Sequence, residues 1–472
     1  MGNQASKIAG TFAVGVAVGS LVSGKFRNPT AASGGAAQEQ AEQAPAPVAA
    51  SNPVAATPTI TVRVELLKQF TRAVFEHCGV EPEAAAEAAE VLLLADMRGI
   101  YSHGIARLHA YYEMLHAGVI NAKPDVRIVH ETPSTATVDG DNGLGLIVGP
   151  AANRIAMAKA EQSGSGWVTV RNTHHYGIAG YYCLQAVAQP HPMIGFSMTT
   201  ASNVVTPLWG RERMLGTNPI AVAFPCAEEK PLVVDLATSV VPWGKVEEAA
   251  RTGGVLPKGW AVDAEGRDAT DPDAVLASGA LLPLGGTREH SGHKGYCLGA
   301  MVDILCAVLS GGRWGPTVSG FMTHSAVTGG GADGNADAAA PVGACMQTGG
   351  HGQDEEGDDD AISHPGGVAL GIGHFFGAMR VDSFRDEGAF KRNMDEWIRT
   401  FRGSAPVDPA RPVMVPGDPE WAMEAKQARD GVPVKVSVLA DLVDIQTRTG
   451  VKLPFDYSSM DLSTVKRVQA TA

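Results

Sequence analysis

Two histidine-bearing segments contain side chains that could together move a proton beside a bound carboxylate. The first is Tyr101-Ser102-His103-Gly104, which Arg107 and Tyr111 follow at four-residue spacing. An unperturbed histidine titrates near neutral pH, and an arginine one turn later can hold a carboxylate through a bidentate fork. Oxidation of a hydroxy acid by hydride transfer needs such a base, such a cation and a dinucleotide site. Alone, a histidine and an arginine at this spacing are more often a solvated or structural pair.

The second segment is Arg171-Asn172-Thr173-His174-His175-Tyr176-Gly177, which follows the strand-like run Gly166-Trp167-Val168-Thr169-Val170. Polar residues just past the end of a strand commonly line a site. The alternative is a turn in which the two histidines bond to backbone groups, and the residues by themselves favour that turn.

The glycine fingerprint of a phosphate-binding loop is missing. Gly143 and Gly145 lie in Gly-Leu-Gly-Leu-Ile-Val-Gly, and Gly371 and Gly373 lie in Gly-Ile-Gly-His-Phe-Phe-Gly. Neither run has the third glycine at the required spacing. The sequence therefore argues against a standard Rossmann half, and a dinucleotide site here needs another architecture.

Helices are expected on the N-terminal side of the first segment and within it. Glu81-Pro82 begins an alanine-rich helix that Gly99 ends, with proline at the start and glycine at the end. We expect Ser102 to cap the next helix. Four-residue spacing then places three side chains on one helical face, which could form a wall of a cleft: His103, Arg107 and Tyr111.

A third helix is expected near the middle of the chain. The run Tyr296–Leu309 is apolar nearly all round and ends at Gly311. This pattern predicts a helix buried in the centre of a domain.

Composition limits the class of protein. With 472 residues, 44% of them hydrophobic, the chain can bury a large core in two or three folded units. Its 37 basic and 50 acidic side chains give a net charge of −13, which disfavours nucleic acid or an anionic lipid surface as the main partner. The six cysteines form no C-x-x-C pair, which favours free thiols in a reducing compartment over disulfides or a cysteine-rich zinc site.

The N-terminal segment 1–58 differs from the rest and is excluded from the folded core. Its apolar run Ile8–Val22 is flanked by basic residues and is short for a membrane span. Three interpretations stay open: an organelle-targeting presequence, a weak membrane anchor, or N-myristoylation at Gly2 within Met-Gly-Asn-Gln-Ala-Ser. They leave open an association with membranes, and an intracellular location that is cytoplasmic or mitochondrial.

Folded sequence occupies 59–316 and 368–460, which we expect to form one two-lobed core from discontinuous cofactor and substrate parts. Between them, 317–367 is rich in glycine, alanine and aspartate, with six acids between Asp354 and Asp360. This composition predicts a low-complexity insertion in a surface loop. Residues 461–472 form a tail.

Taken together, ordered blocks along the chain resemble the type-2 malate/L-lactate dehydrogenases, a family that includes ureidoglycolate dehydrogenase and diketogulonate reductase. The resemblance covers roughly 60–316 and 368–460. It rests on Asp96-Met-Arg-Gly-Ile-Tyr-Ser-His-Gly-Ile-Ala-Arg-Leu108, Asn172-Thr-His-His-Tyr-Gly-Ile-Ala-Gly180, Leu215-Gly-Thr-Asn-Pro219, Val234-Asp-Leu-Ala-Thr-Ser239, Trp243-Gly-Lys245, Leu282-Pro-Leu-Gly-Gly286, His293-Lys-Gly-Tyr296, Gly373-His-Phe-Phe376 and Val415-Pro-Gly-Asp418.

The resemblance implies an α/β, non-Rossmann dehydrogenase with a largely antiparallel mixed sheet and surrounding helices, in a homodimer. It implies hydride transfer between NAD or NADP and a small 2-oxo or 2-hydroxy acid, with no metal. His103 matches the catalytic acid/base, His175 a second active-site histidine, and Arg107 the contact to the substrate carboxylate, with Tyr111 and Thr200 also on the substrate side. Cofactor contacts would come from Asp235, Leu236, Ala237, Thr238, Ser239, Leu284, Gly285, Pro416, Gly417 and Asp418.

The chain departs from the family pattern at two positions that bear on these roles. Asp418 stands where glutamate is common after Pro-Gly, and Thr199-Thr200 replaces a common Thr-Asn pair. Three other functions remain to be weighed against a hydroxy-acid dehydrogenase. They are a cyclic imine carboxylate reductase, a metal-dependent hydrolase using His103, His174, His175 and His293, and an inactive scaffold tethered by its N terminus.

Overall fold

The structure, a computed structural model, describes residues 58–318 and 371–462. The chain divides into two units, Met1–Pro53 and Val54–Ala472, and every described residue belongs to the second. Among the described helices, none is both long enough and apolar enough to cross a membrane.

Three sequence predictions fall outside the described residues, apart from residues at their edges. They concern the N-terminal segment 1–58, with its run Ile8–Val22 and the acylation at Gly2, the insertion 317–367 and the tail 461–472.

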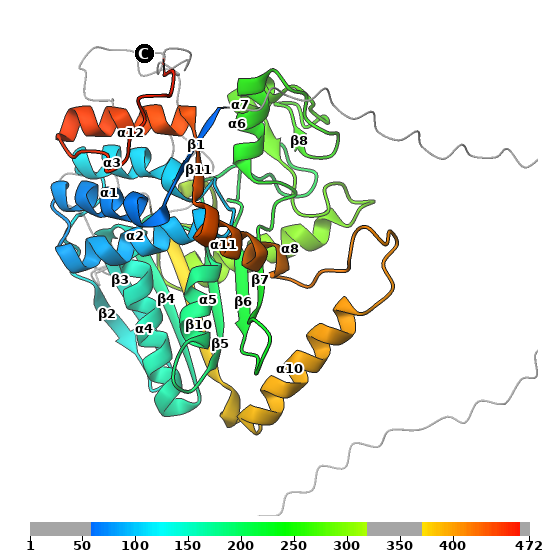
Figure 1. The fold of residues 1–472 in the computed structure, drawn as a ribbon. Helices are drawn as coiled ribbons and strands as arrows, with labels where there is room; N and C mark the ends of the chain where they lie inside the picture. The colour runs from blue at the N-terminus through cyan, green and yellow to red at the C-terminus, as the bar shows by residue number, and fades with distance from the viewer. Residues whose placement is uncertain (1–57, 319–370, 463–472) are drawn as a thin grey trace, which may run out of the picture. The chain divides into compact units, whose positions relative to one another are not determined.

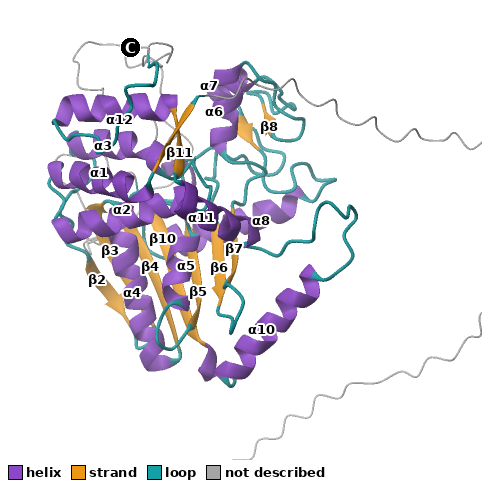
Figure 2. Cartoon of the chain, viewed as in Figure 1, coloured by secondary structure: helices purple, strands orange, loops and turns teal. Residues whose placement is uncertain are grey.

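A mixed sheet forms the centre of the described part (Figures 1 and 2). Its seven strands lie in the order β2-β3-β4-β10-β5-β6-β7, and only β3 and β4 are parallel. The expectation of a largely antiparallel, non-Rossmann sheet is therefore confirmed. The strands are β2 (Arg127–Glu131), β3 (Thr135–Gly143), β4 (Ser165–Thr173), β5 (Met193–Thr199), β6 (Ile220–Phe224), β7 (Leu232–Leu236) and β10 (Ile372–Arg380).

Helices cover both faces of the central strands. Helices α4 (Gly145–Ser163) and α5 (Gly180–Val187) pack on one face, as Figure 1 shows. On the other face α8 (Gly292–Asp303) continues into η2 (Ile304–Val308), which packs on β4 and β10. Because both faces are covered, β10 is buried along most of its length rather than alternately buried and exposed.

The large hydrophobic core extends from the sheet into a helical layer beside it. This layer contains a short two-stranded ladder between the start and the end of the described chain. Its elements are β1 (Thr59–Val62), α1 (Val64–His77), α2 (Pro82–Met97), η1 (Ile105–Arg107), α3 (Leu108–His116), α11 (Asp418–Asp430), β11 (Val432–Lys435) and α12 (Val436–Thr449).

A smaller lobe has its own hydrophobic cluster, around Val246, Val275 and Leu281. It follows β7 in the sequence. Its elements are α6 (Trp243–Thr252), β8 (Ala261–Val262), α7 (Pro272–Ser278) and β9 (Ala280–Leu281); the remaining elements of the chain are η3 (Gly315–Thr317), η4 (Val381–Ser383) and α10 (Glu387–Arg402).

The helix predicted to carry His103 begins later than expected. Helix α2 does start at Pro82 and is followed by Gly99 at φ +78°, as predicted. Residues 101–104 instead form a turn, η1 follows, and α3 begins only at Leu108. Ser102 caps neither element, because Gly104 and Arg107 occupy the N-cap positions. His103 therefore lies on a turn. At Gly104 the backbone lies so close to the Asp96 carboxyl group that no residue with a Cβ atom fits at this position.

The prediction for Tyr296–Leu309 is half wrong. A helical segment is present, but the ladder changes from α-helical to a π-helical turn at Ile304. One side packs on the sheet, whereas Met301, Ile304, Val308 and Leu309 expose 39%, 54%, 51% and 57% of their surface. The segment is apolar on all sides because one face is buried on the sheet and the other face is apolar but exposed. The spacing of apolar residues cannot distinguish such an exposed face from a buried one.

Candidate active site

A buried carboxyl group supports the turn that carries His103. Asp96, near the end of α2, accepts a hydrogen bond from the backbone N–H of Ile105 at 2.6 Å. A methyl group at Gly104 would overlap this carboxyl group, so only glycine lets the turn lie on it. Burial raises the pKa of Asp96 to about 8. Sequence reasoning gave Asp96 no role, although an acid within the apolar run Leu92–Met97 was a usable signal.

His175 lies at the end of β4, where Asp139 holds the chain in place. The Asp139 carboxylate accepts from Arg171 Nε at 3.2 Å and from Asn172 Nδ2 at 2.9 Å. Asn172 has φ +54°, a left-handed conformation that asparagine tolerates better than most residues. Asp139 thereby fixes the backbone that enters the two histidines, and it too was missed because no spacing links it to them.

The turn and the strand end bring both predicted histidines together. The His103 and His175 ring centroids are 5.3 Å apart. Tyr111, buried in α3, places its hydroxyl 2.6 Å from Nδ1 of His175. Ser102 Oγ lies 2.9 Å from Nδ1 of His103. The structure thus unites the two histidines predicted from separate segments, and Tyr111 lies behind His175.

Arg107 lies beside this pair. Its Nε donates to the carbonyl oxygen of Ser102 at 2.6 Å, which anchors the guanidinium to the turn that carries His103. Burial, reinforced by the Arg107 charge, lowers the pKa of His103 to about 4. Burial also lowers the pKa of His175, with further contributions from His103 and Arg107. Both imidazoles are therefore neutral at pH 7, and a carboxylate bound at Arg107 would offset part of the positive charge that disfavours their protonation.

The first glycine-rich run has a packing role. Gly145 is the first residue of α4, and a methyl group there would overlap the carbonyl oxygens of His174 and His175. The end of α4 thus lies directly against the peptide that carries the site. The run Gly143-Leu-Gly145, rejected as a phosphate loop, allows this close approach.

Gly145→Ala is expected to destabilise the fold by about 1–3 kcal/mol, because backbone atoms must move to admit the methyl group. The displacement reaches His175, so kcat should fall as well. Gly388→Ala in α10 is the matched control: its methyl group would meet only side-chain atoms, Arg392 Nη1 at 3.2 Å and Asp386 Oδ1 at 3.6 Å. Urea unfolding of both variants tests this. Equal stability of Gly145→Ala and wild type would contradict the packing argument.

Thr200 is buried, and its contacts are made to the chain itself. Its hydroxyl accepts from the Gly373 N–H at 3.0 Å, and its own N–H donates to the Gly373 carbonyl at 3.0 Å. These bonds join the end of β5 to the start of β10. The substrate contact predicted for Thr200 stays a prediction, and the structure shows Thr200 hydrogen-bonded between two strands.

Two further histidines are fully buried behind the site. His374 Nδ1 lies 2.8 Å from Thr199 Oγ1, and its ring stacks on Tyr176 with centroids 4.5 Å apart. His174 Nε2 lies 2.9 Å from Asn142 Oδ1. Burial lowers the pKa of both His174 and His374 to about 3. Neither ring can be protonated at neutral pH without a cost to the folded state.

These two rings predict a loss of stability in mild acid. Below the unfolded-state pKa of about 6.5, the unfolded chain binds protons that the folded chain excludes. Each ring therefore removes up to about 1.4 kcal/mol per pH unit as the pH falls from 6.5 toward 3. Urea unfolding between pH 7 and 5 should show that the free energy of unfolding falls less steeply with decreasing pH in His374→Asn than in wild type. An equally steep fall in both proteins would contradict this origin.

The predicted cofactor residues at the end of β7 form a wall linked to the His175 segment. Asp235 accepts from the backbone N–H of Gly180 at 2.8 Å, and Gly180 begins α5 just after the histidines. Burial of the carboxyl group raises the pKa of Asp235 to about 6, although part of its surface is exposed. Leu236 next to it exposes 37% of its surface, and Ala237 is half-buried.

The remaining cofactor candidates adjoin this wall through backbone contacts. Leu284 N–H donates to the Thr238 carbonyl at 2.8 Å, and Ser239 pairs with Pro283. Thr238 and Ser239 are themselves buried, and their hydroxyls bond to backbone carbonyls. Leu284 exposes 38% of its surface, and Gly285 has φ +93° with no space for a side chain.

The turn Pro416-Gly417-Asp418 lies against β7 at Val233. A methyl group at Gly417 would lie 3.2 Å from the Val233 nitrogen, which places the turn against the strand. The Asp418 carboxylate is held by both Arg402 Nη2, at 2.6 Å, and Arg402 Nε, at 3.1 Å. It also accepts from the Val415 N–H at 2.9 Å. The structure therefore gives Asp418 a clear role in holding this turn to α10, and its cofactor contact stays a prediction.

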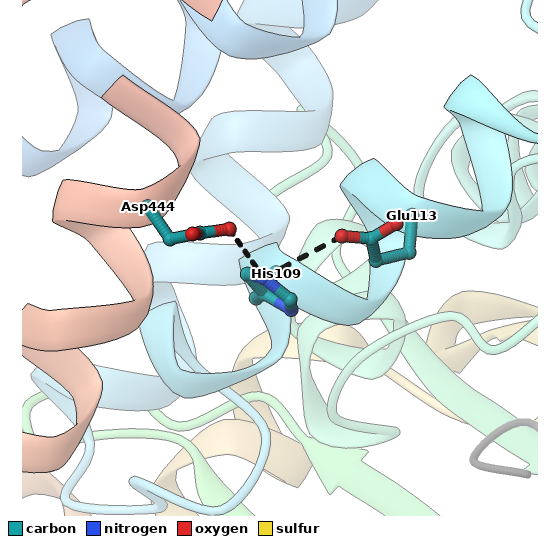
Figure 3. Close-up of side chains that lie close together, drawn as sticks. All are labelled: His109, Glu113 and Asp444. Atoms are coloured by element: carbon teal, nitrogen blue, oxygen red, sulfur yellow. Dashed lines mark hydrogen bonds and ion pairs between the residues drawn. The ribbon is translucent and has the colours of Figure 1, made fainter. Parts of the chain in front are cut away.

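A group of side chains with metal-ligand chemistry lies elsewhere, between α3 and α12 (Figure 3). His109 Nε2 is 3.3 Å from Asp444 Oδ2 and 3.5 Å from Glu113 Oε1. Arg448 bonds to Glu113 and lies 3.6 Å from Asp444, so a cation is already supplied by the chain. In residues 58–318 and 371–462 this is the only such group, and none of the four histidines weighed for a hydrolase belongs to it.

Comparison with known proteins decides the family. The family model for malate/L-lactate dehydrogenase matches residues 62–332 and 341–443, which is most of the chain. The chain belongs to the malate/L-lactate dehydrogenase family. The resemblance drawn from the sequence blocks is thereby confirmed, and the chain is a dehydrogenase of the malate/lactate type.

Several relatives in this family have established names. Malate dehydrogenase from Pyrococcus horikoshii is 36% identical over 394 residues, 83% of this chain and 96% of that protein. Its solved structure has a TM-score of 0.69 and covers 84% of this chain and 97% of its own. L-sulfolactate dehydrogenase from Methanocaldococcus jannaschii is 33% identical, over 83% of this chain and 95% of that protein. A Pseudomonas putida reductase of Δ1-pyrroline-2-carboxylate and Δ1-piperideine-2-carboxylate is 35% identical, over 52% of this chain and 70% of that protein.

A nicotinamide cofactor follows from membership of this malate/L-lactate dehydrogenase family, and the wall at β7 fits one. Two exposed leucines, Leu236 and Leu284, offer apolar surface to a planar ring. Gly285, at φ +93°, lets the backbone turn directly after Leu284, and the His290 carbonyl oxygen lies where a side chain would begin. Arg288 and Lys294, both exposed around the start of α8, supply positive charge suited to phosphate groups.

Proposed function

We propose that this chain transfers hydride between NAD or NADP and a small 2-hydroxy or 2-oxo acid such as malate or lactate. The juxtaposition of His103, His175 and Arg107 carries the proposal, because it places two neutral imidazoles beside one anchored cation. The named relatives act on acids of this class or on cyclic imine carboxylates, all of which carry a carboxylate.

In this proposal each residue has one task. Arg107 binds the substrate carboxylate and orients the carbon that reacts. His103, neutral in the free protein, accepts the hydroxyl proton when the hydroxy acid is oxidised and returns it in the reverse direction. The wall formed by Asp235–Ser239 and Leu284–Gly285 holds the nicotinamide nucleotide, with Pro416–Asp418 as a further contact. That nucleotide, when bound, accepts or supplies the hydride.

Absorbance of reduced nicotinamide tests the proposal. The full chain is assayed with NADH and with NADPH against pyruvate, oxaloacetate, sulfopyruvate and Δ1-piperideine-2-carboxylate. We expect at least one 2-oxo acid to be reduced faster than the cyclic imine. Faster imine reduction would favour the reductase function instead. Calorimetric titration with both nucleotides accompanies the assay, and failure to bind either would favour an inactive scaffold.

We infer in addition that the chain forms a homodimer through the exposed apolar face of α8 and η2. This face contains Met301, Ile304, Val308 and Leu309, each more than a third exposed. Contiguous exposed apolar residues of this kind mark contact surfaces, and a symmetric pair would bury the same face of each copy. Light scattering after size exclusion should report a dimer for wild type and a monomer for Ile304→Glu. A monomeric wild type would overturn the inference.

A further inference from the structure

The two site histidines differ in how their Nδ1 atoms are bonded, and this difference assigns them different tasks. Two groups approach Nδ1 of His175: the Tyr111 hydroxyl at 2.6 Å and the backbone N–H of Gly177 at 3.3 Å. A backbone N–H can only donate. Nδ1 of His175 therefore accepts, and the single proton of the neutral ring must lie on Nε2.

Tyr111 reinforces this assignment. Its ring is fully buried in α3 and packs edge-on against Phe75, with centroids 6.4 Å apart. Burial raises the pKa of the Tyr111 phenol, which keeps its proton at any working pH. Because Nδ1 of His175 already accepts from the Gly177 N–H, the Tyr111 hydroxyl, 2.6 Å from Nδ1 and 3.4 Å from the His175 carbonyl oxygen, is assigned as a second donor to that nitrogen. The ring edge of His175 that carries Nδ1 is thereby bonded to Tyr111 and Gly177, and the N–H of the neutral ring lies on the opposite edge, at Nε2.

His103 is bonded in another way. Its Nδ1 lies 2.9 Å from Ser102 Oγ, and a hydroxyl can donate or accept. His103 can therefore hold its proton on either nitrogen and exchange it, whereas neutral His175 presents an N–H that it retains. A proton acceptor needs a free lone pair, and only His103 can offer one without breaking a bond to a backbone N–H.

We propose that His175 contacts the substrate oxygen as a neutral Nε2–H donor, held in this tautomer by Tyr111 and Gly177, while His103 alone transfers the proton. The proposal rests on the proposed function. In oxidation, the substrate O–H bond breaks and an N–H bond forms on His103, as the C–H hydride passes to the oxidised nicotinamide. The His175 proton stays on Nε2 and stabilises the developing negative oxygen. Tyr111 is then a positioning residue that acts through His175, and its predicted contact with substrate stays a prediction.

Amide isosteres separate a donor from a base. The amide nitrogen of His175→Gln reaches the Nε2 position and keeps a donor there, whereas the amide of His175→Asn ends at the Nδ1 position. We expect His175→Asn to lose about 100- to 1,000-fold in kcat, the usual effect of removing one such donor. His175→Gln should keep at least about a tenth of kcat and the pH profile of wild type, because the proton still moves through His103. Equal loss in both variants, with an altered pH profile in His175→Gln, would overturn the proposal.

The tautomer can also be read without any turnover. Long-range proton–nitrogen NMR of the full chain with 15N-labelled histidine should show His175 as the Nε2–H form, its signals identified by their loss in His175→Gln. Tyr111→Phe should leave KM unchanged, lower kcat and introduce some of the Nδ1–H form. A wild-type ring protonated on Nδ1 would overturn the proposal even if the enzyme is active. Absence of activity on every acid with the Nε2–H form intact would instead count against the proposed function.

Discussion

His103→Gln is expected to lower kcat/KM for hydroxy-acid oxidation by about 10²- to 10⁴-fold, the usual contribution of a general base. The turn places His103 between Ser102 and the second imidazole, 5.3 Å away by ring centroids. Its pKa of about 4 keeps the free ring neutral and ready to accept a proton over most of the working range. Over the pH range in which the fold is kept, oxidation by wild type should therefore decline as the pH falls toward 4, and the residual activity of the variant should not show this decline.

A matched control separates this effect from a general disturbance. His130→Gln changes the same residue type at an exposed position on β2, away from the site. Its kinetics should equal those of wild type, and the unfolding of both variants by urea should show whether the fold is kept. If His103→Gln retains wild-type kcat/KM while it binds cofactor normally, His103 is not the base.

Arg107→Lys is expected to raise KM for the acid by about 10- to 100-fold, since a charge-assisted hydrogen bond contributes about 1.5–3 kcal/mol. The guanidinium is anchored through Nε to the Ser102 carbonyl, and this bond orients the remaining N–H groups as a fork. Lysine keeps the charge but has neither the anchor nor the planar fork. The change should therefore appear mainly in binding, with a smaller decrease of kcat from the poorer orientation.

The corresponding 2-hydroxy amide, which has no carboxylate, makes this test specific. For wild type, KM should rise about as much on changing from the acid to the amide as it rises through Arg107→Lys with the acid. For Arg107→Lys, KM should rise little further with the amide, because the variant has already lost the bond between the guanidinium and the carboxylate. Additive losses would place the carboxylate elsewhere. Arg127→Lys, exposed on β2, serves as the control.

Sequence patterns gave the correct fold class and two histidines that the structure brings together, but not the local backbone around those histidines. His103 and His175 were identified from ordered blocks, and the structure brings them together from a turn and a strand end. The four-residue spacing of His103, Arg107 and Tyr111 predicted one helical face. The structure instead has a turn at His103, where Gly104 lies against Asp96, and α3 begins only at Leu108. Contacts between distant segments of this kind leave no periodic signal.

The same limit explains the supporting residues and the central helix. Asp139 acts through hydrogen bonds from Arg171 and Asn172, and no sequence spacing links it to the histidines. Asp96 bonds to the Ile105 N–H, and its only signal in the sequence is an acid within an apolar run. For Tyr296–Leu309, apolar residues on all sides were correctly taken as helical, but apolar surface buried on the sheet and apolar surface left exposed have identical composition.

The central position of β10 has a consequence for how the chain can be made. This strand is the last part of the sheet to be synthesised, yet it lies between β4 and β5 and pairs residues as distant as Gly377 and Trp167. Until it emerges from the ribosome, β2-β3-β4 and β5-β6-β7 are separate ribbons, each with an unsatisfied apolar edge. Closure of the sheet is thus a late, high-contact-order event, and nascent chains that stop before residue 372 are expected to aggregate or to need chaperones.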